Sequence, residues 1–271
     1  MSHVVRFLAF AGLSLSAAGS IRAESADADA KAAHEREVQA ALDAFKETFK
    51  GGDDERTGAV KALAAVKDRR IIAALSKIIA DPAQGPPVRL EAIAALGGYE
   101  KSREASAAVV RALAGARKQP EIQIACLNAL GEIRDWNSAS VVIDHFNDTE
   151  SQVGLAAMRA AGRIKSPVFV KDLIKFLDDA GGGGAARSAS FEEWRARRRE
   201  VRLAAHQALC DITGEAKAMP ADPAMAIMGG GRAGNEWEDW WKVYGARVTA
   251  RLQQEEKEAQ ARILKEKRPY S

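Results

Sequence analysis

The feature that most constrains this chain is an internal repeat between residues 55 and 213. Five segments align on one column, with spacings of 33, 34, 31 and 48 residues: Leu63, Leu96, Leu130, Ala161 and Leu209. The residue before this column is Ala in every copy. A period of 31–34 residues is typical of repeat architectures, in which one unit cannot bury its apolar face alone and stacks on its neighbours.

Within each copy the apolar residues fall at helical spacing. In the second copy they run from Val88 through Ile93 and Leu96 to Tyr99. This pattern predicts an amphipathic helix with a wide buried face. The position after the Leu column is small in every copy: Ala64, Gly97, Gly131, Gly162 and Cys210. These small side chains predict a close approach of neighbouring helices.

A second apolar helix follows each of the first four segments. We expect these helices over residues 70–80, 103–114, 138–146 and 167–177, the last started by Ser166 and Pro167. Of the 271 residues, 55 are Ala and only 6% are aromatic, which favours helix over strand. The sequence therefore predicts an all-α fold, an α-solenoid of stacked helix pairs.

The repeated pattern resembles a known family. The segments Val88 to Tyr99 and Ile122 to Ile133 resemble the HEAT repeat, in particular its short PBS-lyase HEAT-like form. The segment Ala208 to Gly214, together with Trp237 to Trp241, resembles the C-terminal end of secreted bacterial HEAT-repeat proteins. The resemblance to the repeat covers residues 55–213. It implies a right-handed superhelix of helix pairs whose second helices line the concave side. HEAT-like repeats serve scaffolds, adaptors and a few enzymes, so the resemblance implies no particular reaction.

The N-terminal 23 residues have the features of a secretory signal peptide. Arg6 precedes an apolar run over residues 7–15, and small residues follow up to Ala23. The run is too short to span a bilayer, and we expect no stable membrane insertion after cleavage. Cleavage leaves 38 basic against 37 acidic residues. We expect a secreted or periplasmic protein without nucleic-acid partners, because binding to nucleic acid needs a strongly basic surface.

The remaining sequence predicts four regions after the signal. Residues 24–213 form the repeat solenoid, capped by a helix over 32–50 and interrupted by a Gly-rich insertion near 180–190. Residues 214–235 form an irregular linker, and residues 236–268 form a C-terminal helix that is first Trp-rich and then charged. Trp237, Trp240 and Trp241 are expected to cap the apolar end of the stack. The sequence leaves open whether the charged half docks or projects.

The candidate chemical groups favour structural roles. Cys126 and Cys210 occupy small-residue columns two units apart, so we expect buried thiols rather than a disulfide or a nucleophile. His206 replaces an apolar residue and is expected at the rim of the stack, bonded to a nearby acceptor. The run Gly181–Gly184 lacks the Lys and Ser/Thr of a phosphate loop. The sequence predicts no catalytic residue, no cofactor and no metal site.

Charged residues on the second helices are the best candidates for partner binding. The first two units lean basic and the third leans acidic, which favours a protein partner. A further positive cluster lies at residues 195–202, diluted by Glu193 and Glu200. The candidate binding residues are Arg69, Arg70, Arg103, Arg111, Lys171, Lys175, Arg197, Arg198 and Arg199.

These observations favour a non-catalytic interaction scaffold of the cell envelope or exterior, with a protein partner of unknown identity. Two alternatives stay open. A lyase-like enzyme, or an enzyme subunit, needs a reactive Cys or acidic group in an open groove. A nucleic-acid binder similar to the HEAT-like DNA glycosylases needs a basic concave face.

Overall fold

The computed structural model describes residues 11–148, 150–178, 191–219 and 234–267, and in these ranges all regular structure is helical. The long N-terminal helix is α1 (Ala11–Thr48). The first helices of the units are α2 (Asp53–Ala64), α4 (Pro86–Gly97), α6 (Pro120–Ile133), α8 (Ser151–Ile164) and α10 (Phe191–Thr213). The second helices are α3 (Arg69–Ala80), α5 (Arg103–Gly115), the 3-10 turn η1 (Trp136–Ser138) with α7 (Ala139–Asp144), and the 3-10 turn η2 (Pro167–Phe169) with α9 (Val170–Asp178). The C-terminal helix is α12 (Asn235–Lys267).

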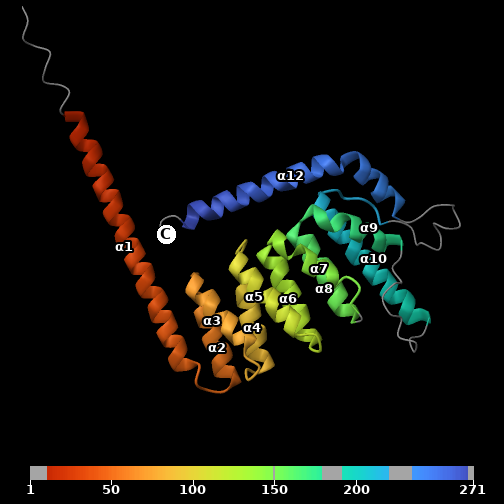
Figure 1. Ribbon diagram of the computed structural model, residues 1–271, viewed down its shortest axis with the longest axis horizontal. Coiled ribbons are helices and arrows are strands. Elements are labelled where there is room, and N and C mark those ends of the chain that lie inside the picture. The colour runs from red at the N-terminus through yellow and green to blue at the C-terminus, as the bar shows by residue number, and fades with distance from the viewer. Residues whose placement is uncertain (1–10, 149, 179–190, 220–233, 268–271) are drawn as a thin grey trace, which may run out of the picture.

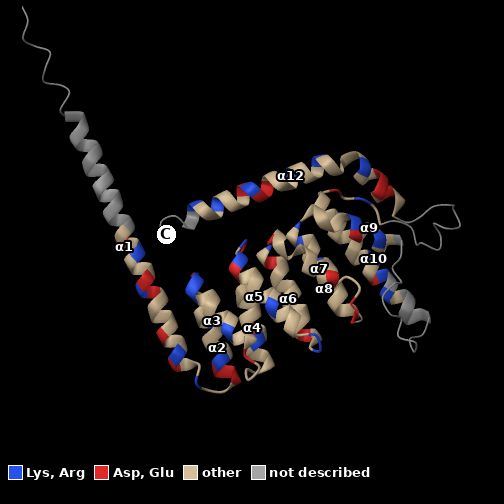
Figure 2. Ribbon diagram, viewed as in Figure 1, with Lys and Arg blue, Asp and Glu red and all other residues tan. Residues whose placement is uncertain are grey.

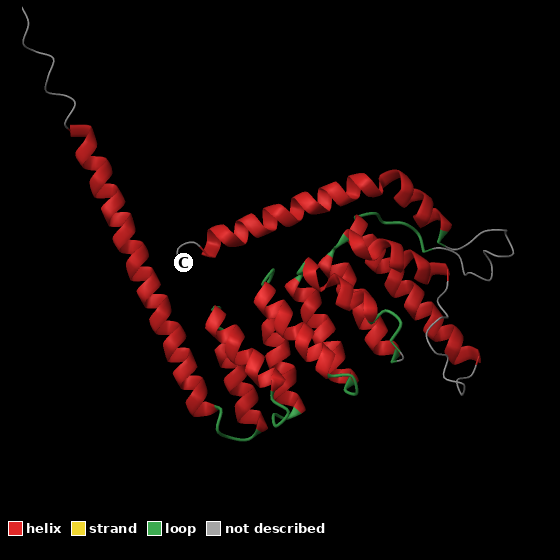
Figure 3. Cartoon of the chain, in the orientation of Figure 1, coloured by secondary structure: helices red, strands yellow, loops and turns green. Residues whose placement is uncertain are grey.

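The helices form two layers in chain order (Figure 1). In the first layer α2 packs on α4, α4 on α6, α6 on α8 and α8 on α10. In the second layer α3 packs on α5, α5 on η1, and α7 on η2. Figure 3 shows the helices joined by short turns along the stack. The predicted all-α, solenoid-like fold is confirmed.

The predicted columns form the core between the layers. Leu63, Leu96, Leu130 and Leu209 are at most 1% exposed. The small columns do bring helices together: a Cβ at Gly131 would lie 3.2 Å from the Cα of Ala160 on α8. Contacts of this length are shorter than most van der Waals contacts, so these columns set the spacing of the first layer.

Two of the predicted second helices are shorter than expected. Residues 138–146 contain α7 of only six residues, preceded by η1. In the fourth unit, Pro167 starts the 3-10 turn η2, and α9 follows only at Val170. Ser166 precedes Pro167 but its side chain makes no capping hydrogen bond. A 3-10 turn rises about 2.0 Å per residue against about 1.5 Å in an α-helix, so fewer residues span the same length, which fits the 31-residue spacing that contains η1.

In the second, third and fourth units, the turn from the first to the second helix carries a basic residue in the left-handed conformation. Lys101, Arg134 and Lys165 have φ values of 57°, 57° and 56°, and Gly214 follows with φ 74° at the corresponding place. A non-glycine residue rarely adopts this conformation. These turns lie along one edge of the stack, which we call the turn edge.

The helix α12 runs along the turn edge and closes the C-terminal end of the stack (Figure 1). Its first turn buries Trp237, which is 1% exposed, as expected for a cap. Further along, Val248 and Leu252 are also buried. The helix starts at Asn235, one residue before the predicted 236–268 segment. Its charged half docks on the turn edge, where Glu256 contacts Lys101, and this answers the question that the sequence left open.

Other predicted boundaries fall partly outside the described residues. The Gly-rich insertion near 180–190 lies entirely outside them, as does most of the linker at 214–235. The expected N-terminal cap over 32–50 belongs to the longer helix α1, and residues 1–10 of the expected signal are not described. None of the described helices has the length and apolar character needed to span a membrane.

Candidate functional site

Five basic residues cover neighbouring parts of α3 and α5. This surface, the basic face, consists of Arg69, Arg70, Lys77, Arg103 and Arg111, all exposed. The residues recur with the repeat, because Arg103 and Arg111 lie 34 positions after Arg69 and Lys77. Within α3 and α5 the one carboxylate is Glu104, whose Oε1 lies 3.6 Å from Nε of Arg69. Figure 2 shows basic residues where both helices begin.

Small side chains separate the cations of the basic face. Ala73 on α3 and Ala107 on α5 are exposed and occupy equivalent positions of their units. Alanine leaves room for a second chain to approach the helix backbone, while the long Arg and Lys side chains reach its acidic groups. The basic face can therefore hold an acidic protein segment.

One residue of the basic face also has a structural task. The backbone N–H of Arg70 donates to Oδ1 of Asp68 at 2.7 Å, and its Nε donates to the same oxygen at 3.0 Å. Burial opposes ionisation of Asp68, but these hydrogen bonds outweigh it and lower the pKa of the carboxyl. Asp68 thus caps α3 as an anion, and Arg70 is less free to contact a partner than Arg103 or Arg111.

The other predicted binding residues lie elsewhere. Lys171 and Lys175 are exposed on α9, and Lys175 pairs with Asp172 at 2.8 Å. Exposed Asp144 on α7 lies between them and the basic face in the chain order of the second layer. Arg197 and Arg199 are exposed on α10, and the side chain of Arg198 is outside the described residues. The predicted binding residues on α3 and α5 therefore share one surface. Those on α10 belong to a helix of the other layer.

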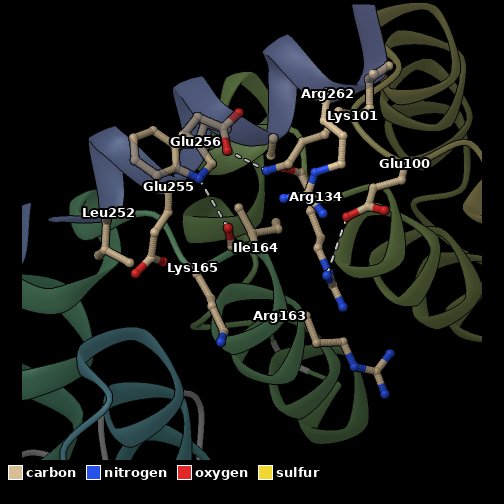
Figure 4. A pocket seen from close by; sticks show the side chains of 13 residues that line it. Glu100, Lys101, Arg134, Arg163, Ile164, Lys165, Leu252, Glu255, Glu256 and Arg262 are labelled. Atoms are coloured by element: carbon tan, nitrogen blue, oxygen red, sulfur yellow. Dashed lines mark hydrogen bonds and ion pairs between the residues drawn. The ribbon is translucent and has the colours of Figure 1, made fainter. Parts of the chain in front are cut away.

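A second site, which the sequence reasoning missed, is a groove between α12 and the turn edge (Figure 4). The groove has a volume of about 440 Å³. Its walls carry the left-handed residues Lys101, Arg134 and Lys165 on one side and Glu255 with Glu256 on the other. Trp136 closes one wall by donating its indole N–H to the carbonyl of Ile164 at 3.1 Å.

Ion pairs already use most of the charge in this groove. Nζ of Lys101 contacts Glu256 and also donates to the carbonyl of Arg134 at 2.8 Å. The Lys101 and Glu256 side chains are only 10% and 12% exposed. Arg134 reaches Glu100 at 3.3 Å. The groove therefore lies where α12 docks on the repeat units. The sequence signal for it was the basic residue that recurs in the turn between the two helices of three units.

A polar cluster at the start of α12 contains His206. Its Nδ1 accepts the indole N–H of Trp237 at 3.3 Å, so the ring proton must sit on Nε2, which donates to the carbonyl of Lys217 at 3.0 Å. Burial lowers the pKa of His206. The histidine is neutral and bonded to an acceptor, as expected from the sequence, and it holds α12 to α10.

Both cysteines are free thiols in the structure. Cys126 is fully buried, and burial raises its pKa to about 12. Cys210 is only half-buried, contrary to the expectation that both are buried, and its Sγ lies 3.7 Å from Nε2 of His206. Burial also raises the pKa of Cys210, so this thiol is protonated beside a neutral imidazole. Neither arrangement gives the thiolate that a nucleophile requires.

The last residue of the positive cluster predicted at residues 195–202 is buried rather than exposed. Arg202 is 5% exposed and donates from Nε to the carbonyl of Leu177 at 3.1 Å. It is part of the core of the stack rather than of a solvated face.

No protein-family model matches the chain, and no curated protein matches it in sequence. The HEAT resemblance therefore rests on the repeat pattern of residues 55–213. In the part of the chain that the structure describes, His, Cys, Asp and Glu side chains form no group of three that could hold a metal ion.

Proposed function

We propose that this protein is a non-catalytic interaction scaffold of the cell envelope or exterior, built from HEAT-like units. It binds a partner protein through the repeat surface. The observation that carries the proposal is the basic face: five exposed cations and a single carboxylate on two adjacent helices, of which Arg69 and Lys77 recur as Arg103 and Arg111 with an exposed alanine between the two cations of each helix. A surface of this kind selects an acidic protein segment by complementary charge.

The docking of α12 supports the same proposal. The solenoid already holds one amphipathic helix along its turn edge, through buried Val248 and Leu252 and through the Lys101–Glu256 pair. This contact combines an apolar stripe with carboxylates that face basic turns. It supports the proposal by analogy, because an intramolecular helix of this kind already packs on another surface of the repeat.

The test is partner capture from an envelope extract with three forms of the full chain. The wild-type protein is compared with Arg103→Glu/Arg111→Glu, which reverses two exposed cations of the basic face. The matched control is Arg117→Glu/Lys118→Glu, which makes the same charge change in the exposed loop between α5 and α6. The proposal predicts one partner, in near-stoichiometric yield, that only the first variant loses. No partner above background, or equal loss in both variants, contradicts it.

A further inference from the structure

A shallow groove lies between α1 and α3, beside the basic face. Its volume is about 410 Å³. Leu42 and Phe45 of α1, with Phe49 just after its end, form one wall, and Ala74 with Ile78 of α3 forms the other. We call it the α1–α3 groove. We infer that it is a docking site for an acidic amphipathic helix of a partner protein, an inference that rests on the proposed scaffold function.

The α3 wall of the groove is equivalent to a surface of α5 that packs against a neighbouring helix. On α5, the stripe that faces α3 carries Glu104, which reaches Arg69, and one turn later Ala108, which is 5% exposed. The equivalent stripe of α3, 34 residues earlier, carries Arg70 and Ala74, and both line the α1–α3 groove. Ala74 remains half-buried, because α1 packs on α2 and leaves this stripe of α3 open. The stripe is shaped for close helix packing and lacks its helix.

An arginine at the end of the groove lacks the carbonyl that its counterparts bind. Nε of Arg89 donates to the carbonyl of Ile79, near the end of α3, and Nε of Arg202 does the same to Leu177, near the end of α9. Arg56, 33 residues before Arg89, has a buried Nε without a hydrogen-bond partner. Its guanidinium lies 5.6 Å from the ring of Phe49, which lines the groove.

A buried acceptor at the same end is also without a partner. Nη1 of Arg89 donates to Oε1 of Gln119, which precedes α6. The residue equivalent to Gln119 before α4 is Gly85, and the glutamine next to it, Gln84, lines the groove with an Oε1 that is buried without a partner. A helix that ends beside Arg56 offers free carbonyls to this cation. The bound helix therefore runs parallel to α3, with its C-terminus beside Arg56.

The rim of the groove selects acidic side chains. It carries the cations Lys46, Arg70 and Lys77 and the carboxylate Asp81. Lys46 and Arg70 form ion pairs with Asp43 and Asp68, and a partner carboxylate can share these cations because such surface pairs are weak. Arg70 and Lys77 also belong to the basic face, so one acidic segment can cover both surfaces. Apolar side chains at i, i+4 and i+7 of a partner helix would fill the groove, while its Glu or Asp residues face the rim.

A second copy of the chain is a poorer occupant than a partner. Stacking of copies end to end would require the last second-layer carbonyls of one copy to reach Arg56 of the next. In the structure Leu177 already bonds Arg202, and α12 covers that end with buried Trp237.

The test uses the full chain and two fluorescent peptides of about 18 residues, or five helical turns. One peptide carries a Leu stripe with Glu at the other positions, and the second has Lys in place of every Glu. Fluorescence anisotropy should show binding of the acidic peptide alone. Ala73→Trp fills the edge of the groove from an exposed position and should weaken binding about tenfold or more, or roughly 1.4 kcal/mol.

The matched control is Ala94→Trp, the same change at an exposed position of α4 that belongs neither to the groove nor to the basic face. It should leave peptide binding unchanged, and circular dichroism should show both variants to be folded. Equal binding of both peptides, equal loss in both variants, or no binding at about 100 µM acidic peptide overturns the inference. Self-association of the wild type that Ala73→Trp abolishes overturns the choice of a partner helix.

Partner capture separates this inference from the proposed function. If Arg103→Glu/Arg111→Glu loses the partner while Ala73→Trp retains it, the scaffold function stands and the groove assignment is wrong.

Discussion

At the scale of residues, buried polar contacts join successive units in a way that the apolar pattern does not reveal. Arg89 and Arg202 both lie seven positions before the repeat column, and each donates to a carbonyl of the preceding unit. The sequence reasoning placed Arg202 in a solvated cluster. The column was hard to recognise because Gln123 and Gly154 occupy it in the third and fourth units.

Replacing Arg202 should therefore destabilise the stack. In Arg202→Met the carbonyl of Leu177 loses a charged donor in a buried place, and we expect the free energy of unfolding to fall by about 1.5–3 kcal/mol. Arg199→Met changes an exposed position of the same helix and should cost less than about 0.5 kcal/mol. Urea unfolding followed by circular dichroism measures both, and equal effects would show that the Arg202 contact is unimportant.

The buried thiol of Cys126 should make stability depend on alkaline pH. The pKa is about 12 in the folded protein against an ordinary value of 9.0. Between these values the unfolded chain loses a proton that the folded protein keeps. The free energy of unfolding should then fall as pH rises, by about 1.4 kcal/mol per pH unit for this group.

Cys126→Ala should reduce this slope between pH 9 and 12. Alanine occupies the same column in the other four units, at Ala59, Ala92, Ala157 and Ala205, so the fold should tolerate the change. A smaller slope will remain, because burial also raises the pKa of Tyr99 to about 12. An unchanged slope in Cys126→Ala would mean that its thiol ionises equally in both states.

At the scale of elements, the helix pairs could be predicted because each repeated column of small or apolar residues marks a contact between neighbouring helices. The Gly column is graded: a Cβ at Gly162 would lie 3.2 Å from Cα of Ala208, whereas a Cβ at Gly97 would lie 3.5 Å from Cα of Ala129. The first distance forces the helices apart, and the second is ordinary contact. The pattern thus predicts where helices meet, but only coordinates reveal how tightly.

Two alanine substitutions should separate these cases. Gly162→Ala should lower the free energy of unfolding by about 1–3 kcal/mol, because α8 and α10 must shift. Gly97→Ala should be neutral or stabilising by up to about 1 kcal/mol, because alanine favours the helix. Thermal and urea unfolding test both, and greater damage from Gly97→Ala would reverse the predicted order.

The docking of α12 should depend on its buried ion pair. Glu256→Gln removes the charge that faces Lys101, and we expect amide hydrogen exchange in the second half of α12 to become about tenfold faster. Glu258→Gln is the matched control on an exposed position of the same helix. Slow exchange in both variants would mean that Leu252 and Val248 alone hold the helix.

At the scale of the whole molecule, the sequence predicted the stacked layers but not the surface that remains open. The sequence did not reveal where α12 docks, because the apolar stripe of this helix weakens after Leu252 and a charged helix resembles one that is exposed to solvent. Its partners are turn residues from different units, and their common edge exists only after stacking. For the same reason Arg56 and Gln84 become exceptional only by comparison with Arg89 and Gln119.

We propose that the basic face is the partner-binding surface of this protein. The most direct measurement is hydrogen–deuterium exchange of the full chain with and without its captured partner. We expect protection to appear in α3 and α5 and to extend into the adjoining part of α1. Protection confined to α8 and α10, with α3 and α5 unchanged, would contradict it.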